Sequence, residues 1–74
     1  MSTSLESYEE ALTAARDFAA SGNKKDRARV ALAVAQIGGL VELMDEASPG
    51  SPVNIESMRR VGVLCRALAG HRER

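Results

Sequence analysis

Apolar residues recur at helical spacing in three segments of this 74-residue chain. In residues 5–20 the spacing alternates between three and four, which places the apolar residues on one side of an amphipathic helix. This side carries Leu5, Tyr8, Leu12, Ala15 and Ala19, and the other carries Glu6, Glu9, Glu10, Thr13 and Asp17. Thr3 and Glu6 have the spacing of a capping box, and Gly22 or Asn23 suits a left-handed C-cap. We predict a first helix over residues 5–20.

A second helix is predicted over residues 26–47, with Asp26 as its N-cap. Its core-facing stripe has the spacing four, three, four, three and is widened by Ala33 and Leu40. The stripe consists of Val30, Val34, Ile37, Val41 and Met44. Leu32 and Leu43 lie on nearly the opposite side, so this helix has apolar groups on two faces. It is therefore expected to be the central element, or to present one face to another chain.

The stretch SPGSP at 48–52 predicts a turn, because two prolines and a glycine do not continue a helix. A third helix follows over about 52–69, capped by Ser51 or, if it starts later, by Asn54. Its predicted core stripe is Met58, Val61, Cys65 and Leu68, flanked by Ile55 and Leu64. Residues 70–74 form a charged tail. The fold class is all-α: one domain over 1–74, a small three-helix bundle made of a helical hairpin plus a third helix, and dimeric.

Gly38 and Gly39 stand side by side within the second predicted helix, where each glycine costs roughly 0.5–1 kcal/mol relative to alanine. Ala31, Ala35 and Gly39 form a row of small residues on this helix. A similar row on the first helix consists of Ala11, Ala15 and Ala19. Two such rows allow helix axes to approach closely, within the chain or between two copies. The alternative is a kink at the glycine pair. We favour close packing.

Composition limits what can stabilise the fold. The chain is 45% hydrophobic but only 3% aromatic, so the core is built from aliphatic residues, and a single cysteine excludes a disulfide within one copy. A core of this size is marginal, so close helix packing or a second chain is expected to add stability. No signal-peptide pattern begins the chain, and the longest apolar run is too short to span a bilayer. We expect a cytoplasmic protein without a membrane partner.

The charges sum to zero, but their order is uneven. The second helix has basic residues at its start and acidic residues at its end, the reverse of what the helix macrodipole favours. In an up-down-up bundle one end would be basic. The other would gather seven acidic residues against Arg59 and Arg60: Glu6, Glu9, Glu10, Glu42, Asp45, Glu46 and Glu56. A molecule of this kind is suited to dock antiparallel on itself, or to present its basic end to a phosphate-bearing partner; ordinary solvated faces are the simpler interpretation.

No residue pattern indicates catalysis. Cys65 lies on a predicted apolar stripe and is expected to be buried. His71, the only histidine, lies in the tail without a residue to orient it. Adjacent acidic pairs such as Glu9–Glu10 and Asp45–Glu46 diverge by about 100° on a helix, and nucleotide-binding glycine motifs are missing from the sequence. We predict no enzyme, no cofactor, no metal site and no small-molecule substrate.

The sequence therefore predicts a non-enzymatic protein-protein interaction module, such as an adaptor, co-chaperone or stoichiometric inhibitor. It would form a homodimer, bind a partner protein, or do both through an apolar helix face. The predicted partner-binding residues are Leu32, Ala35, Gly39, Leu43 and Val63. The alternative is a small nucleic-acid-binding regulator that uses basic residues as phosphate contacts. Those residues are Lys24, Lys25, Arg27, Arg29, Arg59 and Arg66.

Overall fold

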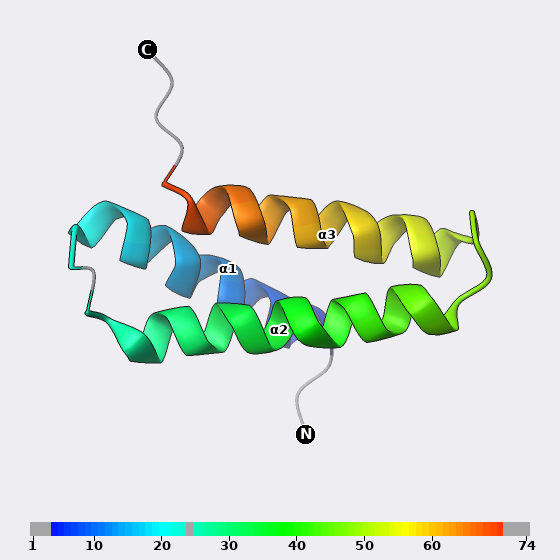
Figure 1. The fold of residues 1–74 in the computed structure, drawn as a ribbon, viewed down its shortest axis with the longest axis horizontal. Helices are drawn as coiled ribbons and strands as arrows, with labels where there is room; N and C mark the ends of the chain where they lie inside the picture. The colour runs from blue at the N-terminus through cyan, green and yellow to red at the C-terminus, as the bar shows by residue number, and fades with distance from the viewer. Residues whose placement is uncertain (1–3, 24, 71–74) are drawn as a thin grey trace, which may run out of the picture.

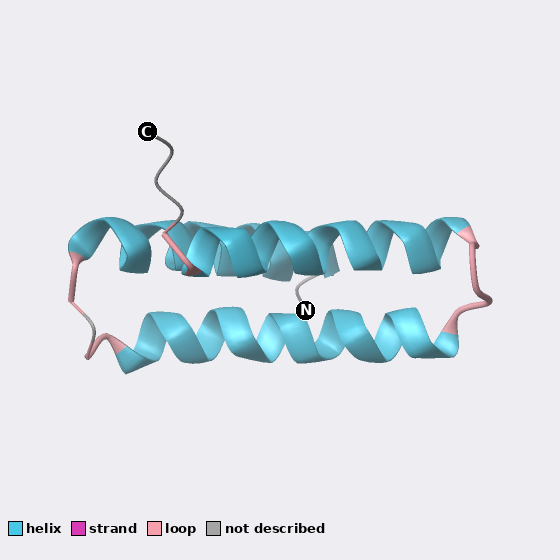
Figure 2. Ribbon diagram, turned by 45° about the horizontal axis from the view of Figure 1, so that its top comes forward, coloured by secondary structure: helices cyan, strands magenta, loops and turns pink. Residues whose placement is uncertain are grey.

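The fold is an all-α bundle of three helices (Figure 1). A computed structural model describes residues 4–23 and 25–70, with side chains described from residue 7 onward. The helices are α1 (Ser4–Ser21), α2 (Arg27–Glu46) and α3 (Pro52–Leu68). Helices α2 and α3 form an antiparallel hairpin, and α1 crosses one side of it obliquely (Figure 1). In the turned view, α1 lies behind α3 (Figure 2). The predicted three-helix bundle is confirmed.

Local capping residues explain where α1 ends and α2 begins. Gly22 follows α1 with a φ of 72°, a left-handed conformation that glycine adopts without steric cost. Asp26 is the N-cap of α2, and its side chain accepts a hydrogen bond from the backbone N–H of Arg29 at 3.3 Å. Both assignments agree with the sequence prediction. The predicted cap at Thr3 lies outside the described residues.

The turn between α2 and α3 is held by side chains of its own sequence. Ser51 is the N-cap of α3 and Pro52 occupies its first turn, so the alternative cap at Asn54 is wrong. Asn54 instead donates from Nδ2 to the carbonyl of Met44 at 2.9 Å and accepts from the N–H of Gly50 at 3.2 Å. These bonds bring Met44 and Asn54 to the same level of the hairpin and so set the register of α3 against α2.

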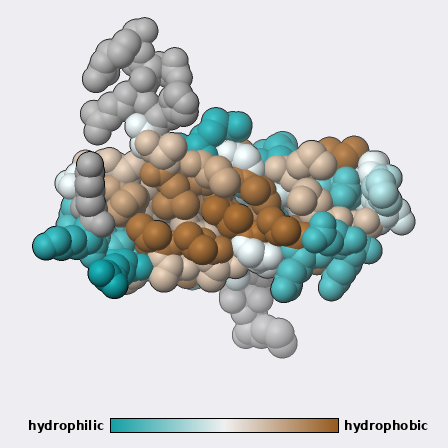
Figure 3. Space-filling view, in the orientation of Figure 1, coloured by the Kyte–Doolittle hydropathy of each residue, from teal (hydrophilic) through white to brown (hydrophobic). Residues whose placement is uncertain are grey.

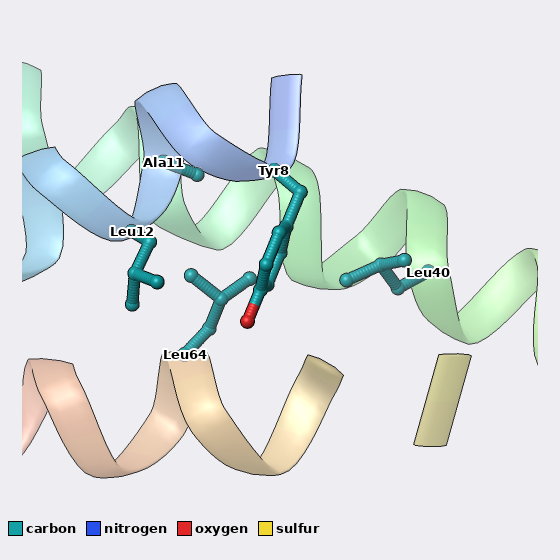
Figure 4. Close-up of a cluster of buried hydrophobic side chains, with 5 residues drawn as sticks. All are labelled: Tyr8, Ala11, Leu12, Leu40 and Leu64. Atoms are coloured by element: carbon teal, nitrogen blue, oxygen red, sulfur yellow. The ribbon is translucent and has the colours of Figure 1, made fainter. Parts of the chain in front are cut away.

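The core lies where α1 crosses the hairpin (Figure 4). Tyr8, Ala11 and Leu12 of α1 cluster there with Leu40 of α2 and Leu64 of α3. The ring of Tyr8 points between the two leucines of the hairpin. Its other partner is the guanidinium of Arg60, which lies 5.0 Å from the ring centroid. The predicted core side of the first helix is therefore confirmed for Tyr8 and Leu12.

Buried alanines line the side of α1 that packs against the hairpin. Ala11, Ala14 and Ala15 are buried on α1, and Ala33 is buried on α2. Side chains of this size let helix axes approach closely. Dispersion contacts between the closely packed helices then supply stability that a core of larger apolar side chains would otherwise provide. The predicted small-residue row of the first helix is therefore buried at Ala11 and Ala15. The predicted row on α2 is wrong, because Ala31, Ala35 and Gly39 are exposed and α2 contributes Ala33 instead.

The predicted core stripes of α2 and α3 are only partly correct. Val34 on α2 is 53% exposed, and on α3 Ile55 is 56% and Met58 54% exposed. Cys65, which was expected to be buried, is also exposed. The fully buried residue of α3 is Leu64, with Ser57 beside it on the same arc. The physical reason is the placement of α1, which covers one edge of each apolar arc and leaves the other edge uncovered.

The glycine pair does not mediate close packing within the chain. Gly38 and Gly39 are exposed, and a Cβ built at either position meets no atom within 4 Å. The kink alternative is wrong as well, because α2 is one continuous α-helix that runs straight through the pair (Figure 1). The two glycines therefore weaken α2 without a compensating contact inside the described chain.

Candidate functional site

One side of the α2–α3 hairpin is not covered by α1, and we call it the open face. On α2 its residues follow the spacing four, three, four, three, four, and on α3 the spacing is three, four, three, as in helices that pack side by side. The open face consists of Arg27, Ala31, Val34, Gly38, Val41 and Asp45 on α2, and Ile55, Met58, Gly62 and Cys65 on α3. All of these residues are exposed except Val41 and Gly62, which are half-buried.

Two pairs of neighbouring residues locate the open face relative to α1. Residues two apart on a helix point about 160° away from each other. Leu32 lines a groove that α2 forms with α1, so Val34 points to the other side of the hairpin. Arg60 lies over Tyr8 of α1, so Met58 points away from α1 in the same manner. The stripes of α2 and α3 therefore share the side opposite α1.

The surface of this side is apolar. Figure 3 views the molecule from this side and shows apolar side chains gathered between α2 and α3. Three large apolar residues, Val34, Ile55 and Met58, are each more than half exposed there. Monomeric soluble proteins rarely expose large contiguous patches of this kind, and such patches are typical of protein interfaces. The open face is therefore the candidate functional site.

Three ion pairs form among the described residues, and none involves the charges that border the α2 stripe. Asp26 pairs with Arg29 at 2.5 Å, and Glu56 pairs with Arg60 at 3.1 Å and with Arg59. Arg27 and Asp45, at the two ends of the α2 stripe, belong to none of them. At opposite ends of α2 the open face thus has one charge of each sign that belongs to no ion pair among the described residues.

The paired carboxylates have altered acidity. The Arg29 guanidinium donates to Asp26, as does the Arg29 backbone N–H, and together they hold the pKa of Asp26 below its usual value. Glu56 has a lowered pKa for the same reason, chiefly the hydrogen bond from Arg59, whose own pKa is raised. These pairs stabilise the starts of α2 and α3, and Arg29 and Arg60 lie on the side of the hairpin that α1 covers.

We expect acid to destabilise the start of α2 through Asp26. A carboxyl whose pKa is lower in the folded state stabilises the fold above its unfolded pKa of about 4, and the contribution is lost as the pH falls through the folded value. In thermal unfolding followed by circular dichroism, Asp26→Asn should show a shallower loss of Tm between pH 6 and pH 3 than the parent chain. An unchanged pH profile would contradict this role. Glu46→Gln, which lies outside any described ion pair and outside the open face, is the control.

Four of the predicted partner-binding residues are exposed on one arc of α2, and the fifth, Val63, lies apart from them on α3. Leu32 is 44% exposed in the groove with α1, whereas Leu43 is 39% exposed in a depression lined by α3 residues such as Val53 and Glu56. Ala35 and Gly39 are exposed on the outer side of α2. Val63, which was expected to be exposed, is half-buried and packs against the core, because it follows the arc of α3 that α1 covers.

The basic residues predicted as phosphate contacts are also divided. Arg29 and Arg59 are engaged by Asp26 and Glu56, at opposite ends of the hairpin. Lys25 and Arg27 are exposed near the start of α2, and Arg66 is exposed in the last turn of α3 at the same end. Lys24 lies outside the described residues.

The path of α1 weakens the predicted separation of basic and acidic residues between the two ends of the bundle. Glu9 and Glu10 line the groove with Arg29 and Leu32, in the first half of α2, so the prediction that they join the acidic end is wrong. Glu42, Asp45 and Glu46 remain exposed at the other end of α2. Without α1, the α2–α3 hairpin has the charge order that the sequence indicates, basic at the start of α2 and acidic at its end.

Within residues 4–23 and 25–70 there is no group of three or more His, Cys, Asp or Glu side chains arranged to hold a metal ion. The same residues contain no helix with the length and hydropathy needed to cross a bilayer. His71 lies outside them. The chain matches no protein-family model, no curated protein and no solved structure.

Sequence reasoning assigned the large apolar residues of the open face, such as Val34 and Met58, to the core. A hydrophobic stripe shows which side of a helix avoids water, but not which neighbour covers it. One signal was available: Arg27 and Asp45 continue the α2 stripe at its two ends, and charged residues are almost never fully buried unless they are paired.

Proposed function

We propose that this chain is a protein-binding module that acts through the open face, by stoichiometric contact with helices of a partner. The observation that carries the proposal is the exposure of Val34, Ile55 and Met58 on one side of the hairpin. Covering three large apolar side chains stabilises a complex by removing them from water. The two antiparallel helices present these exposed apolar side chains on one side, which suits contact with the apolar face of partner helices.

A photo-crosslinking amino acid at Met58 tests this proposal in cells that express the chain. We expect a discrete covalent adduct from Met58, and none from Arg16, an exposed position on α1. The adduct should disappear when Val34→Asp is added, while the helical content measured by circular dichroism is retained.

Two outcomes would overturn the proposal. One is the absence of an adduct at Met58. The other is an adduct that persists at full yield with Val34→Asp. A crosslinker at Leu32 serves as a further comparison, because an adduct there but not at Met58 would move the interface to the groove between α1 and α2.

A further inference from the structure

We infer that the partner of the open face is a second copy of this chain, related by a two-fold axis perpendicular to the helices. In this arrangement α2 packs antiparallel on α2 of the second copy, and α3 on α3. The inference rests on the proposed function and specifies its partner. Four features of the open face support it: charge, shape, register and size.

The charges at the ends of α2 select the antiparallel orientation. Arg27 and Asp45 are 18 residues apart, which is five helical turns, so both project to the same side of α2. Gln36 lies midway between them. When two α2 helices cross antiparallel at Gln36, Arg27 lies beside Asp45 of the second copy, and the symmetric pair forms as well. A parallel pairing would instead bring like charges together, which is unfavourable.

The same alignment matches large side chains with small ones. Val34 lies opposite Gly38 of the second copy, since the two positions are equally distant from Gln36, and Val41 lies opposite Ala31. The space above Gly38 is empty in the single chain, where an added Cβ meets nothing within 4 Å. The valine of one copy thus fills the space left by the glycine of the other, which allows close approach of the helices.

The register of the hairpin lets one two-fold axis serve both helices. The hydrogen bond from Asn54 to Met44 places these residues at one level. Eight residues back from Met44 is Gln36, and eight residues on from Asn54 is Gly62, so Gln36 and Gly62 share a level. An axis through both brings the two Gly62 residues together. Met58, four residues before Gly62, then lies within one residue of Cys65 of the second copy, which is three residues after Gly62. The axis that matches the charges on α2 therefore also sets a large side chain near a small one on α3.

The face is large enough for a reversible dimer. The α2 stripe is about 27 Å long and two packed helices are about 18 Å wide, so each copy presents on the order of 500 Å². Two copies would bury on the order of 1,000 Å², the lower boundary for specific interfaces. We therefore expect micromolar rather than nanomolar self-association.

Sedimentation of purified protein from about 5 to about 500 μM tests the inference. The parent chain should pass from monomer to dimer over this range. Gly38→Leu should weaken dimerisation at least tenfold, because leucine occupies the space for Val34. Gly39→Leu is the matched control: it has the same gain in helix propensity and the same open surroundings in the monomer, but points about 100° away, and its dimerisation should change less than about threefold.

A charge exchange tests the orientation. Arg27→Asp and Asp45→Arg should each weaken dimerisation about tenfold, and the double variant should recover to within about threefold of the parent chain. Both single substitutions improve the match of α2 to its macrodipole, so a loss of association is not explained by a loss of helix.

A monomeric parent chain at all concentrations would overturn the inference, as would equal effects of Gly38→Leu and Gly39→Leu, or a double charge variant weaker than either single one. Failure of the proposed function is distinguishable from these results. If the chain is monomeric but still forms a Met58 adduct with another protein, the proposed function stands and only the dimer is overturned. The absence of any adduct at Met58 would overturn both the proposed function and the dimer.

Discussion

Leu64→Ala is expected to lower the free energy of unfolding by about 2–5 kcal/mol, because Leu64 is fully buried where the three helices meet. Domains of this size have a total stability of about 4–11 kcal/mol, so the variant should be largely unfolded under mild denaturing conditions. Urea unfolding followed by circular dichroism, at a concentration low enough to keep the chain monomeric, measures the change.

Met58→Ala on the same helix is the control for Leu64→Ala. Met58 is 54% exposed, so its truncation should change the free energy of unfolding of the monomer by less than about 0.5 kcal/mol. Simple periodicity had placed Met58 in the core and Leu64 at its flank. A larger loss for Met58→Ala than for Leu64→Ala would show that α3 is rotated relative to the structure described above.

Ala15→Leu is expected to destabilise the bundle by about 1–3 kcal/mol through overpacking. Ala15 has no exposed surface, and the neighbouring Ala11 and Ala14 show that this side of α1 accepts only small side chains. A leucine there has to push α1 away from the hairpin. The measurement is the shift of the urea midpoint together with the loss of helical signal from α1.

Ala20→Leu serves as the matched control for Ala15→Leu, since Ala20 is exposed near the end of the same helix. Its effect should stay within about 0.5 kcal/mol. If Ala15→Leu were as well tolerated as Ala20→Leu, the close approach of α1 to the hairpin would be contradicted.

Much of the fold could be predicted from the sequence because its signals are local. Gly22, Asp26, Ser51 and Pro52 mark helix ends by backbone conformation and capping, which depend on only a few neighbouring residues. The core side of α1 was predictable too, since this helix has a single apolar side and the hairpin covers it.

The candidate site was not predictable in the same way. Helices α2 and α3 have apolar arcs wider than one neighbouring helix can cover, so periodicity leaves open which edge becomes buried. The choice depends on where α1 crosses, and that is fixed by Ala33, Leu40 and Leu64 at long sequence distance. The glycine pair illustrates the same limit, because the sequence shows the small side chains but not whether a helix faces them.

The position of Tyr8 gives the protein an internal optical probe. The chain has no tryptophan and one tyrosine, and its ring lies among residues of all three helices with the Arg60 guanidinium above it. Ultraviolet emission excited at a wavelength that phenylalanine does not absorb therefore arises from one ring, at the place where α1 meets the hairpin. Since Tyr8 is on the side opposite Val34 and Met58, this emission reports the docking of α1 separately from any event on the open face.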